Sequence, residues 1–493
     1  MDLVFRLAVI VPVILILRVL TKLVRAIFDP LRTVPGPSLA RFTRLWEVWQ
    51  VCKGDFEKTN VELHRRYGPI VRLAPGRYSV CDQIASKIIY GPGSAFTKSN
   101  YYQPFGDPHG GVNLFTESSP QIHSDARRKV ASLYSMTALV SCEPHVDHMN
   151  SFLCSRLTLC AEKGESIDIP TWMQYYAFDV IGEITLGKPF GMMERGYDSM
   201  GILKGIDTML TYASAIGLVP KLNLWIHALN HRLSRPSPAK GLNDFAAQCI
   251  GDRKHGRTQS DRDDFLTKLM RLRDSGSISD AYQESTVASN ITAGSDTTAI
   301  TLSCIIYSLL WNPACAQELR NEIDTFAREG RISNPVTFKE AQNMPYLQAV
   351  IKEALRIHPA TGQILARIVP ASGAELCGYH VPAGTCVGIN AWALHRDTSI
   401  WGPDADTFRP ERWLEEGASV LERSFMPFGL GSRTCIGKNI SLLEVAKVIP
   451  QIYRNFEIHH VNPGNPEVWE TDNRFFVKQK FQCGIVQRTG LDF

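Results

Sequence analysis

The sequence lacks the short cysteine spacings that structural zinc sites and redox-active thiol pairs use. Its twelve cysteines are scattered from Cys52 to Cys483, and none belongs to a CxxC pair. In a chain of 493 residues, such scattered thiols fit a reducing compartment better than a disulfide framework. We therefore expect most of the cysteines to be small buried hydrophobic residues.

A strong charge of one sign is also missing. Lys and Arg number 53 against 49 Asp and Glu, so the net charge is only +4, and no long basic run lies beyond the N-terminus. This balance argues against a nucleic-acid-binding protein. The sequence has no internal repeat and no low-complexity linker, so we expect one large domain after the N-terminal segment.

The N-terminal segment contains an unbroken apolar run from Leu7 to Leu17, between Arg6 and Arg18. With its flanks the run is just long enough to span a bilayer, and it lacks the small-residue cleavage site of a signal peptide. Basic residues after the run favour a cytoplasmic position for the rest of the chain: Arg18, Lys22, Arg25 and Arg32. The sequence thus predicts a single transmembrane signal anchor over residues 1–28 and a catalytic domain over 29–493. An amphipathic helix lying on the membrane surface is the alternative.

The rest of the chain has mainly helical patterns with a few short β-like pieces. Residues 284–311 form one long, mostly apolar helical stretch that ends at Asn312-Pro313, and residues 338–357 predict another helix. The expected β segments are residues 69–73, 78–81, 375–381 and 385–389. We therefore expect a mainly α fold with small sheets.

A glycine-rich stretch, FGLGSRTCIG from Phe428 to Gly437, surrounds Cys435. Its glycines let the backbone turn sharply and lie against a flat object, and the apolar helical pattern after it places Cys435 at or just before a helix N-terminus. Backbone N–H groups and the helix dipole stabilise a thiolate there. A thiolate beside a flat object suits the axial ligand of a haem iron, and the guanidinium of Arg433 suits a haem propionate.

Other kinds of site fit this stretch less well. A zinc site would need more Cys or His residues at short spacing. A nucleophile elbow needs glycine two residues before the nucleophile, where Arg433 stands. Thr434 occupies the last glycine position of a GxGxxG motif. A plain surface loop stays open on this motif alone.

FGLGSRTCIG resembles the haem-binding signature of the cytochrome P450 superfamily, F-G-x-G-x-R-x-C-x-G, at every defined position. The resemblance implies the cytochrome P450 fold, a helical triangular prism with small sheets. It also implies haem b held by Cys435 as the metal ligand, with Phe428 and Arg433 beside the cofactor. The stretches GSRTCIGKNIS and ITLGKPFG are most similar to fungal members, the pisatin demethylase-like group among them.

A second motif is EALR, from Glu353 to Arg356. Its spacing of three puts both charges on one helical face, although such a pair is common and weak on a solvated face. The motif resembles the E-x-x-R pair of the family, and FRPERW places Arg412 at the position of the family's second arginine. The resemblance implies a buried structural network of Glu353, Arg356 and Arg412.

A third motif, AGSDTT from Ala293 to Thr298, lies inside the long apolar stretch. Polar side chains are costly there unless they have partners, and local bonding back to the helix is the plain alternative. Asp296 and Thr297 match the acid–alcohol pair of the family. The resemblance implies that Thr297 hydrogen-bonds dioxygen and that Asp296 relays protons from water, as a general acid does.

Three further residues resemble haem-propionate partners of the family. His123 and Arg127 in HSDARR occupy its W-x-x-x-R positions, with His in place of Trp, and Arg367 in LARIV resembles another propionate arginine. Taken alone, each of these three residues could nearly as well be a charged side chain in contact with solvent. Family analogy also places substrate-pocket walls near residues 100–118, 203–220, 286–297, 361–366 and 472–478, with apolar side chains such as Tyr101, Phe105, Ile291 and Phe476.

The resemblance implies a monooxygenase that inserts one oxygen atom of O2 into a lipophilic small molecule of secondary metabolism. The sequence has no flavin or nicotinamide motif, so electrons must come from a partner. The implied donor is an NADPH-cytochrome P450 reductase, with cytochrome b5 as a further candidate, at the endoplasmic reticulum membrane. Two alternatives stay open: a haem-thiolate isomerase or dehydratase that needs no reductase, and a noncatalytic haem-binding protein. The Asp296–Thr297 pair argues against the isomerase, because that chemistry needs no proton relay.

Overall fold

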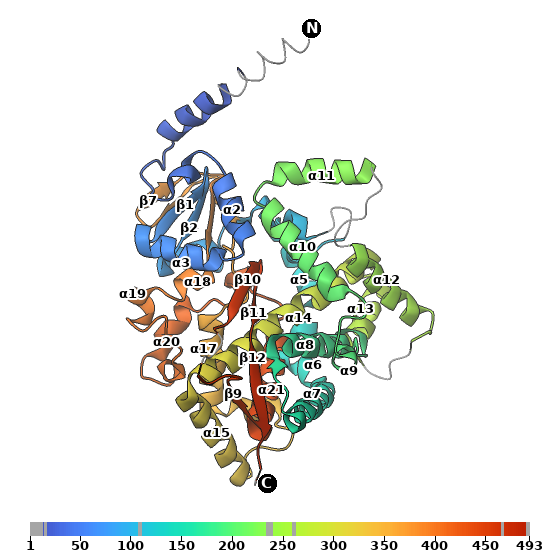
Figure 1. Cartoon of the computed structure of the whole chain (residues 1–493). Coiled ribbons are helices and arrows are strands. Elements are labelled where there is room, and N and C mark those ends of the chain that lie inside the picture. Colours follow the sequence, from blue (N-terminus) through green and yellow to red (C-terminus); the bar gives the residue numbers. More distant parts are fainter. Residues whose placement is uncertain are drawn as a thin grey trace, which may run out of the picture.

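Helices make up most of the computed structural model, which describes residue 13 and residues 17–106, 111–232, 240–258, 263–464 and 468–489 (Figure 1). The longer helices are α2 (Leu45–Lys53), α3 (Phe56–Tyr67), α5 (Pro120–Val130), α7 (Glu143–Lys163), α8 (Ile169–Leu186), α10 (Ile202–Ile216), α11 (Pro220–Arg232), α12 (Lys240–Lys254), α13 (Phe265–Asp274), α14 (Asp280–Trp311), α15 (Pro313–Arg328), α17 (Pro345–Ile357) and α21 (Lys438–Asn455). The shorter ones are α4 (Gln83–Tyr90), α6 (Met136–Val140), α9 (Met192–Arg195), α16 (Phe338–Gln342), α18 (Ala391–Leu394), α19 (Thr398–Trp401) and α20 (Ala418–Leu421). The predicted mainly α fold is confirmed.

The strands form small sheets at the edges of the helical body. Within the described residues, the largest sheet has the order β1-β2-β8-β5-β3, and its strands are β1 (Ile70–Ala74), β2 (Arg77–Val80), β8 (Cys386–Ile389), β5 (Arg367–Ile368) and β3 (Thr97–Lys98). A second sheet joins β4 (Ile167–Asp168), β12 (Gln482–Gln487) and β9 (Phe456–His459). Two hairpins complete the set: β6 (Ala374–Leu376) with β7 (Tyr379–Val381), and β10 (Glu470–Arg474) with β11 (Phe476–Lys480).

The long helix α14 runs through the middle of the molecule, against α8 and beside the β10–β11 hairpin (Figure 1). Ser279 caps its N-terminus by accepting a hydrogen bond from the backbone N–H of Tyr282, and Pro313 starts α15 directly after the helix ends. Gly294 lets α8 come close, because a Cβ there would lie 2.8 Å from the side chain of Ile181. The helix predicted at residues 284–311 is therefore correct, and it begins earlier, at Asp280.

Two predicted segments are wrong in detail. The helix expected at residues 338–357 is two helices, α16 and α17, because Pro345 starts α17 and has no N–H to continue the preceding helix. The strand expected at residues 375–381 is the β6–β7 hairpin. Its turn residues Cys377 and Gly378 have φ of 50° and 79°, the left-handed conformation that a tight hairpin turn requires.

The predicted N-terminal anchor lies largely outside the described residues, which leave out residues 1–12 and 14–16. Residues 17–27 are helical, and nearly all of their side chains are exposed. Among the described residues, no single helix has the length and apolar composition to cross a membrane, and only α14 and α15 taken together, with a bend of 110° between them, would pass on these two criteria.

A buried acid in α21 makes stability depend on pH. Glu444 is 0% exposed, and neither of its carboxyl oxygens has a hydrogen-bond partner among the described residues. Burial raises the pKa of Glu444 well above its ordinary value of 4.5. The folded protein therefore keeps the proton that the unfolded chain loses above that pH, so stability falls as pH rises, by about 1.4 kcal/mol per pH unit until the folded pKa is reached.

Replacing Glu444 with glutamine, which cannot ionise, should remove this dependence. We expect Glu444→Gln to match the unchanged protein in melting temperature at pH 5 and to melt at a higher temperature at pH 8. The matched control is Glu457→Gln, because Glu457 on β9 is exposed. If the melting temperature changes by the same amount between pH 5 and pH 8 in all three proteins, Glu444 does not cause the pH dependence.

Candidate active site

The cysteine loop runs from the short turn η6 (Gly431–Arg433) into α21. Gly431 has a φ of 65°, and a Cβ at this position would lie 1.8 Å from the carbonyl oxygen of Tyr90, so only glycine fits. The backbone N–H of Cys435 donates to the carbonyl oxygen of Phe428 at 2.8 Å. Cys435 therefore lies just before α21, whose N-cap is Gly437, as the sequence predicts.

The Cys435 thiol is both accessible and enclosed. Its side chain is exposed to water, yet burial by surrounding protein raises the pKa of its thiol, against the lowering effect of the backbone N–H groups of Gly437 and Lys438. These two observations conflict for a thiol on the outer surface. Water reaches this thiol, yet protein closely surrounds it, as in a recess of the protein. A cation bound there would stabilise the thiolate form.

Three arginines predicted from the sequence, Arg127, Arg367 and Arg433, gather beside this loop together with His123. Arg127 Nη1 donates to the carbonyl oxygen of Thr434 at 2.8 Å, and Arg433 Nη1 donates to that of Glu117 at 2.7 Å. Burial, followed by the charge of Arg433, lowers the pKa of His123 to about 3. Burial, followed by the charge of Arg367, lowers the pKa of Arg433 to about 10. The cluster is therefore short of negative charge.

Lys98 is a further cation of this cluster that the sequence analysis missed. The register of β3 with β5 places Lys98 directly beside Arg367, and its Nζ donates to the carbonyl oxygen of Phe115. Burial, followed by the charges of Arg367 and Arg433, lowers the pKa of Lys98 well below its ordinary value. No local motif marks this lysine, and only the pairing of two distant strands reveals it.

The cation cluster and the thiol together fit a haem. The arginines and Lys98 bond mainly to backbone carbonyl oxygens within the described residues, for example Arg367 to Ala366 at 3.1 Å. Guanidinium and ammonium groups held in this way can still take a ligand with two carboxylates. Cys435 supplies the thiolate that a haem iron accepts, and Phe428, half-buried, lies at the start of the same loop. The donor set therefore suits the predicted cofactor.

One face of α14 is open although most of the helix is buried. Ala293 is exposed and Thr297, one turn later, is partly exposed, whereas Ser295 and Thr298 are buried. Thr297 Oγ1 donates to the carbonyl oxygen of Ala293 at 2.8 Å, which leaves the hydroxyl oxygen free to accept a hydrogen bond. A hydrogen bond back to the helix was the alternative to a functional role for the AGSDTT motif. The structure contains this bond and also an open face of α14.

Asp296 points away from that open face. Its Oδ1 accepts a hydrogen bond from Gln174 Nε2 on α8 at 2.6 Å, and its Oδ2 lies 3.0 Å from Lys478 Nζ on β11. The side chain is fully buried. The structure thus places Asp296 and Thr297 next to each other in sequence but directs their polar groups to different sides of α14.

The structure brings Glu353, Arg356 and Arg412 together in the core. Arg356 Nη2 lies 2.7 Å from Glu353 Oε1, and Arg412 Nε lies 3.0 Å from the same oxygen. Trp413 Nε1 donates to Glu353 Oε2 at 2.9 Å, and the backbone N–H of Arg409 donates to Glu353 Oε1 at 2.9 Å. The network joins α17 to the turn η4 (Pro410–Trp413).

His395 extends this network toward the cysteine loop, although no sequence motif marks it. The backbone N–H of Met426 donates to its Nε2 at 2.9 Å, so Nε2 must be the unprotonated nitrogen. Nδ1 then donates to the carbonyl oxygen of Arg356 at 3.0 Å. Burial, followed by the charge of Arg356, lowers the pKa of His395 to about 3. A neutral His395 thus connects α17 to the segment that leads into Phe428.

Comparison with known proteins identifies the family. Residues 35–481 match the Cytochrome P450 family model. The chain is 43% identical over 468 residues to a pisatin demethylase of Fusarium vanettenii, covering 94% of this chain and 90% of that protein. It is 36% identical over 469 residues to the cytochrome P450 monooxygenase gsfF of Penicillium aethiopicum, covering 91% and 92%. The same identity extends over 471 residues to the monooxygenase cicH of Emericella nidulans, covering 93% and 94%. The chain therefore belongs to the cytochrome P450 family of haem-thiolate oxidoreductases.

Proposed function

We propose that this protein inserts one oxygen atom of O2 into a lipophilic small molecule of fungal secondary metabolism. The observation that carries this proposal is the Cys435 thiol beside a cluster of cations, together with the Asp296–Thr297 pair on α14. The names of the relatives support oxidation of small molecules, since one is a pisatin demethylase and others are monooxygenases. Hydroxylation, epoxidation and dealkylation all fit this reaction type.

The proposed site residues have two roles: some hold the cofactor and others move protons. A bound haem with a thiolate ligand supplies the activation of dioxygen. Cys435 is the proposed ligand, and the cation cluster with His123 binds the propionates. Thr297 presents a hydroxyl oxygen on the open face of α14, where it orients a proton donor. Asp296 is the proposed relay of protons from water toward that face.

We also propose the partner and the place of action. Because the sequence has no flavin or nicotinamide motif, an NADPH-cytochrome P450 reductase supplies the electrons, with cytochrome b5 as a further candidate donor. Residues 1–28 anchor the protein in the endoplasmic reticulum membrane, with residues 29–493 on the cytoplasmic side. The support for this arrangement is the apolar run from Leu7 to Leu17 and the basic residues that follow it.

The test reconstitutes the full-length protein with the reductase, NADPH, O2 and a panel of lipophilic compounds. The proposal expects a product that carries one atom from ¹⁸O2, or a dealkylated product, only when NADPH and reductase are both present. Turnover without reductase would instead indicate the isomerase or dehydratase. A protein that binds haem but neither consumes NADPH nor forms any product would be a noncatalytic haem-binding protein.

We expect the hydroxyl of Thr297 to determine whether oxygen is incorporated into the product or released as hydrogen peroxide. We expect Thr297→Ala to keep its carbon monoxide spectrum but to release hydrogen peroxide, with product per NADPH falling by about 10²-fold, the lower end of the effect of a proton-transfer group. The matched control is Thr292→Ala, because Thr292 makes the same back-bond, to Ala288 at 2.8 Å. Equal peroxide release by both variants would remove Thr297 from the proposal.

A further inference from the structure

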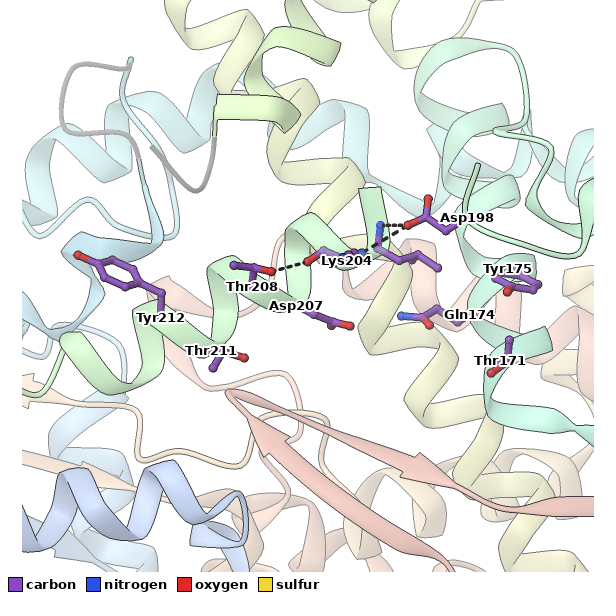
Figure 2. A pocket seen from close by; sticks show the side chains of 10 residues that line it. Thr171, Gln174, Tyr175, Asp198, Lys204, Asp207, Thr208, Thr211 and Tyr212 are labelled. Carbon is purple, nitrogen blue, oxygen red and sulfur yellow. Dashed lines mark hydrogen bonds between the residues drawn. The ribbon is translucent and has the colours of Figure 1, made fainter. Parts of the chain in front are cut away.

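The hollow between α8 and α10 does not suit the lipophilic substrate proposed above. It has a volume of about 730 Å³, and its lining includes the charged side chains of Asp198, Lys204 and Asp207 (Figure 2). Sites for lipophilic small molecules are mostly apolar, with a few polar groups that fix the orientation of the ligand. The open face of α14 and the loop packed against it have this character instead.

Ser289 extends the open face of α14 toward the N-terminus of that helix. It lies one turn before Ala293 and two turns before Thr297, and it is partly exposed, as Thr297 is. Residues four apart lie on the same face of a helix. The three side chains therefore form one row about 12 Å long, since each residue adds roughly 1.5 Å along the helix axis.

The hydroxyl of Ser289 is bonded differently from the neighbouring hydroxyls of α14. Thr286, Thr292 and Thr297 each donate to the carbonyl oxygen four residues earlier, at 2.8 Å. Ser289 Oγ instead accepts a hydrogen bond from Asn113 Nδ2 at 3.0 Å, and among the described contacts it donates to no acceptor. A serine hydroxyl carries one proton that it can donate. Ser289 therefore presents a hydrogen-bond donor on the open face.

The loop that contacts Ser289 also fixes the position of an aromatic ring, that of Phe115. Asn113 Oδ1 accepts a hydrogen bond from the backbone N–H of Phe115 at 2.8 Å. Lys98 on β3 donates to the carbonyl oxygen of Phe115, and Arg433 donates to a carbonyl oxygen of the same loop at 2.7 Å. The loop is thus tied to α14, to β3 and to the cysteine loop, which places Phe115 between the cation cluster and α14.

The ring of Phe115 is 38% exposed although other aromatic rings surround it. Its edge-to-face neighbours, with ring centroids 5.3, 5.6 and 5.7 Å away, are Tyr102, Phe105 and Phe475. Lys98 lies over the ring as well, with Nζ 4.6 Å from the centroid. Aromatic pairs in this geometry attract each other beyond the effect of buried area alone. The exposed part of the Phe115 ring therefore favours an aromatic ligand over a saturated one.

We propose that Ser289 is a specificity-determining residue: its hydroxyl donates to an acceptor oxygen of the substrate, while an aromatic ring of the same substrate packs against Phe115. The substrate class is then an aromatic compound with a carbonyl or ether oxygen about 12 Å from the carbon that is oxidised, which is the length of the row from Ser289 to Thr297. This inference rests on the proposed function, because that function places the oxidised carbon beside Thr297.

The test measures dissociation constants of three probes by equilibrium dialysis, with the haem-loaded, full-length protein and without NADPH or reductase. The first probe is a biphenyl with an acetyl group at one end and a methyl group at the other. The second has an ethyl group in place of the acetyl group, so it lacks the acceptor oxygen. The third is the fully saturated bicyclohexyl analogue of the acetyl probe, so it lacks the aromatic rings.

We expect Ser289→Ala to weaken binding of the acetyl biphenyl about tenfold, the effect of losing one hydrogen bond, and to leave binding of the ethyl biphenyl unchanged. Phe115→Leu should weaken binding of both biphenyls about fivefold, the effect of losing an aromatic pair, and leave binding of the saturated probe nearly unchanged. The matched controls are Ser295→Ala, because Ser295 is buried in α14, and Phe152→Leu, because Phe152 is a partly buried ring on α7. Both controls should bind all three probes as the unchanged protein does.

Equal weakening of the acetyl and ethyl probes by Ser289→Ala would mean that Ser289 only holds the Asn113 loop, and it would overturn the hydrogen bond to substrate. Equal weakening of all three probes by Phe115→Leu would overturn the preference for an aromatic ring. If the unchanged protein binds none of the probes, the proposed substrate class is wrong. If it binds them but forms no product with NADPH and reductase, the proposed function fails by itself, and the dissociation constants still decide the role of Ser289.

Discussion

Replacing Glu353 with glutamine is expected to lower the free energy of unfolding by about 3–5 kcal/mol, the cost of leaving buried charge without a partner. Glu353 is the carboxylate between two arginines, Arg356 and Arg412, whose side chains are 0% and 2% exposed. Glutamine keeps the size of the side chain and one acceptor oxygen but loses the negative charge. Arg356 would then stay in the core with only carbonyl oxygens as acceptors, whereas Arg412 would keep Asp404 Oδ2, at 3.2 Å, as a carboxylate partner.

The same substitution should also weaken haem binding, because the network reaches the cysteine loop. Trp413, which donates to Glu353, packs against Phe425 with ring centroids 4.9 Å apart. His395 ties Arg356 to Met426, two residues before Phe428. Loss of the network therefore loosens the segment from which the loop starts. Besides a lower melting temperature, we expect a smaller ratio of haem absorbance to protein in the purified variant.

The control for this prediction has the same spacing on a solvated face. Glu62 pairs with Arg65 three residues later on α3, with side chains 68% and 44% exposed, and such exposed pairs contribute little. Glu62→Gln should leave both the melting temperature and the haem content unchanged. Equal losses of stability in the two glutamine variants would mean that burial does not determine how much the Glu353 network contributes to the free energy of unfolding.

The site residues that could be predicted from the sequence are those in short contiguous motifs. FGLGSRTCIG includes Cys435, the glycine turns and the arginine in one stretch, and the helix after it is set by its own apolar pattern. The contacts of Glu353 with Arg356 also follow from helical spacing. Arg412 could be placed only by resemblance, because its contact with Glu353 depends on how η4 packs against α17.

The residues that were missed come together only through long-range packing. Lys98 joins the cation cluster because β3 pairs with β5, and Gln174 reaches Asp296 because α8 packs on α14. Lys478 falls in the range 472–478 expected to form a substrate-pocket wall, yet its ammonium meets Asp296 from the other side. Helical periodicity predicts that the neighbouring side chains of Asp296 and Thr297 point in different directions, but no motif specifies which distant element meets each of them.

Cys386 and Cys435 both lie near arginines, but they differ in what the thiol faces. Cys386 on β8 is 8% exposed, and its Sγ accepts a hydrogen bond from Arg77 Nη1 at 3.1 Å. That arginine also pairs with Glu47, at 2.6 Å, so Cys386 belongs to a buried ion-pair cluster. Cys435 instead is open to water and lies beside the cation cluster. Geometry therefore favours Cys435 as the haem ligand.

Serine in place of Cys435 is expected to abolish the thiolate-type band in the carbon monoxide difference spectrum of the reduced protein, because a serine hydroxyl does not give the thiolate donor that produces it. Monooxygenase turnover with reductase should be lost as well. Cys386→Ser is the matched control and should keep both, since Arg77 and Glu47 can hold a hydroxyl in place of that thiol. If the band survives in Cys435→Ser and disappears in Cys386→Ser, the ligand has been assigned to the wrong cysteine, and the cation cluster would then need a different anionic partner. If both variants keep the band, the metal is held by another residue, and the role of the whole glycine-rich loop in cofactor binding fails with it.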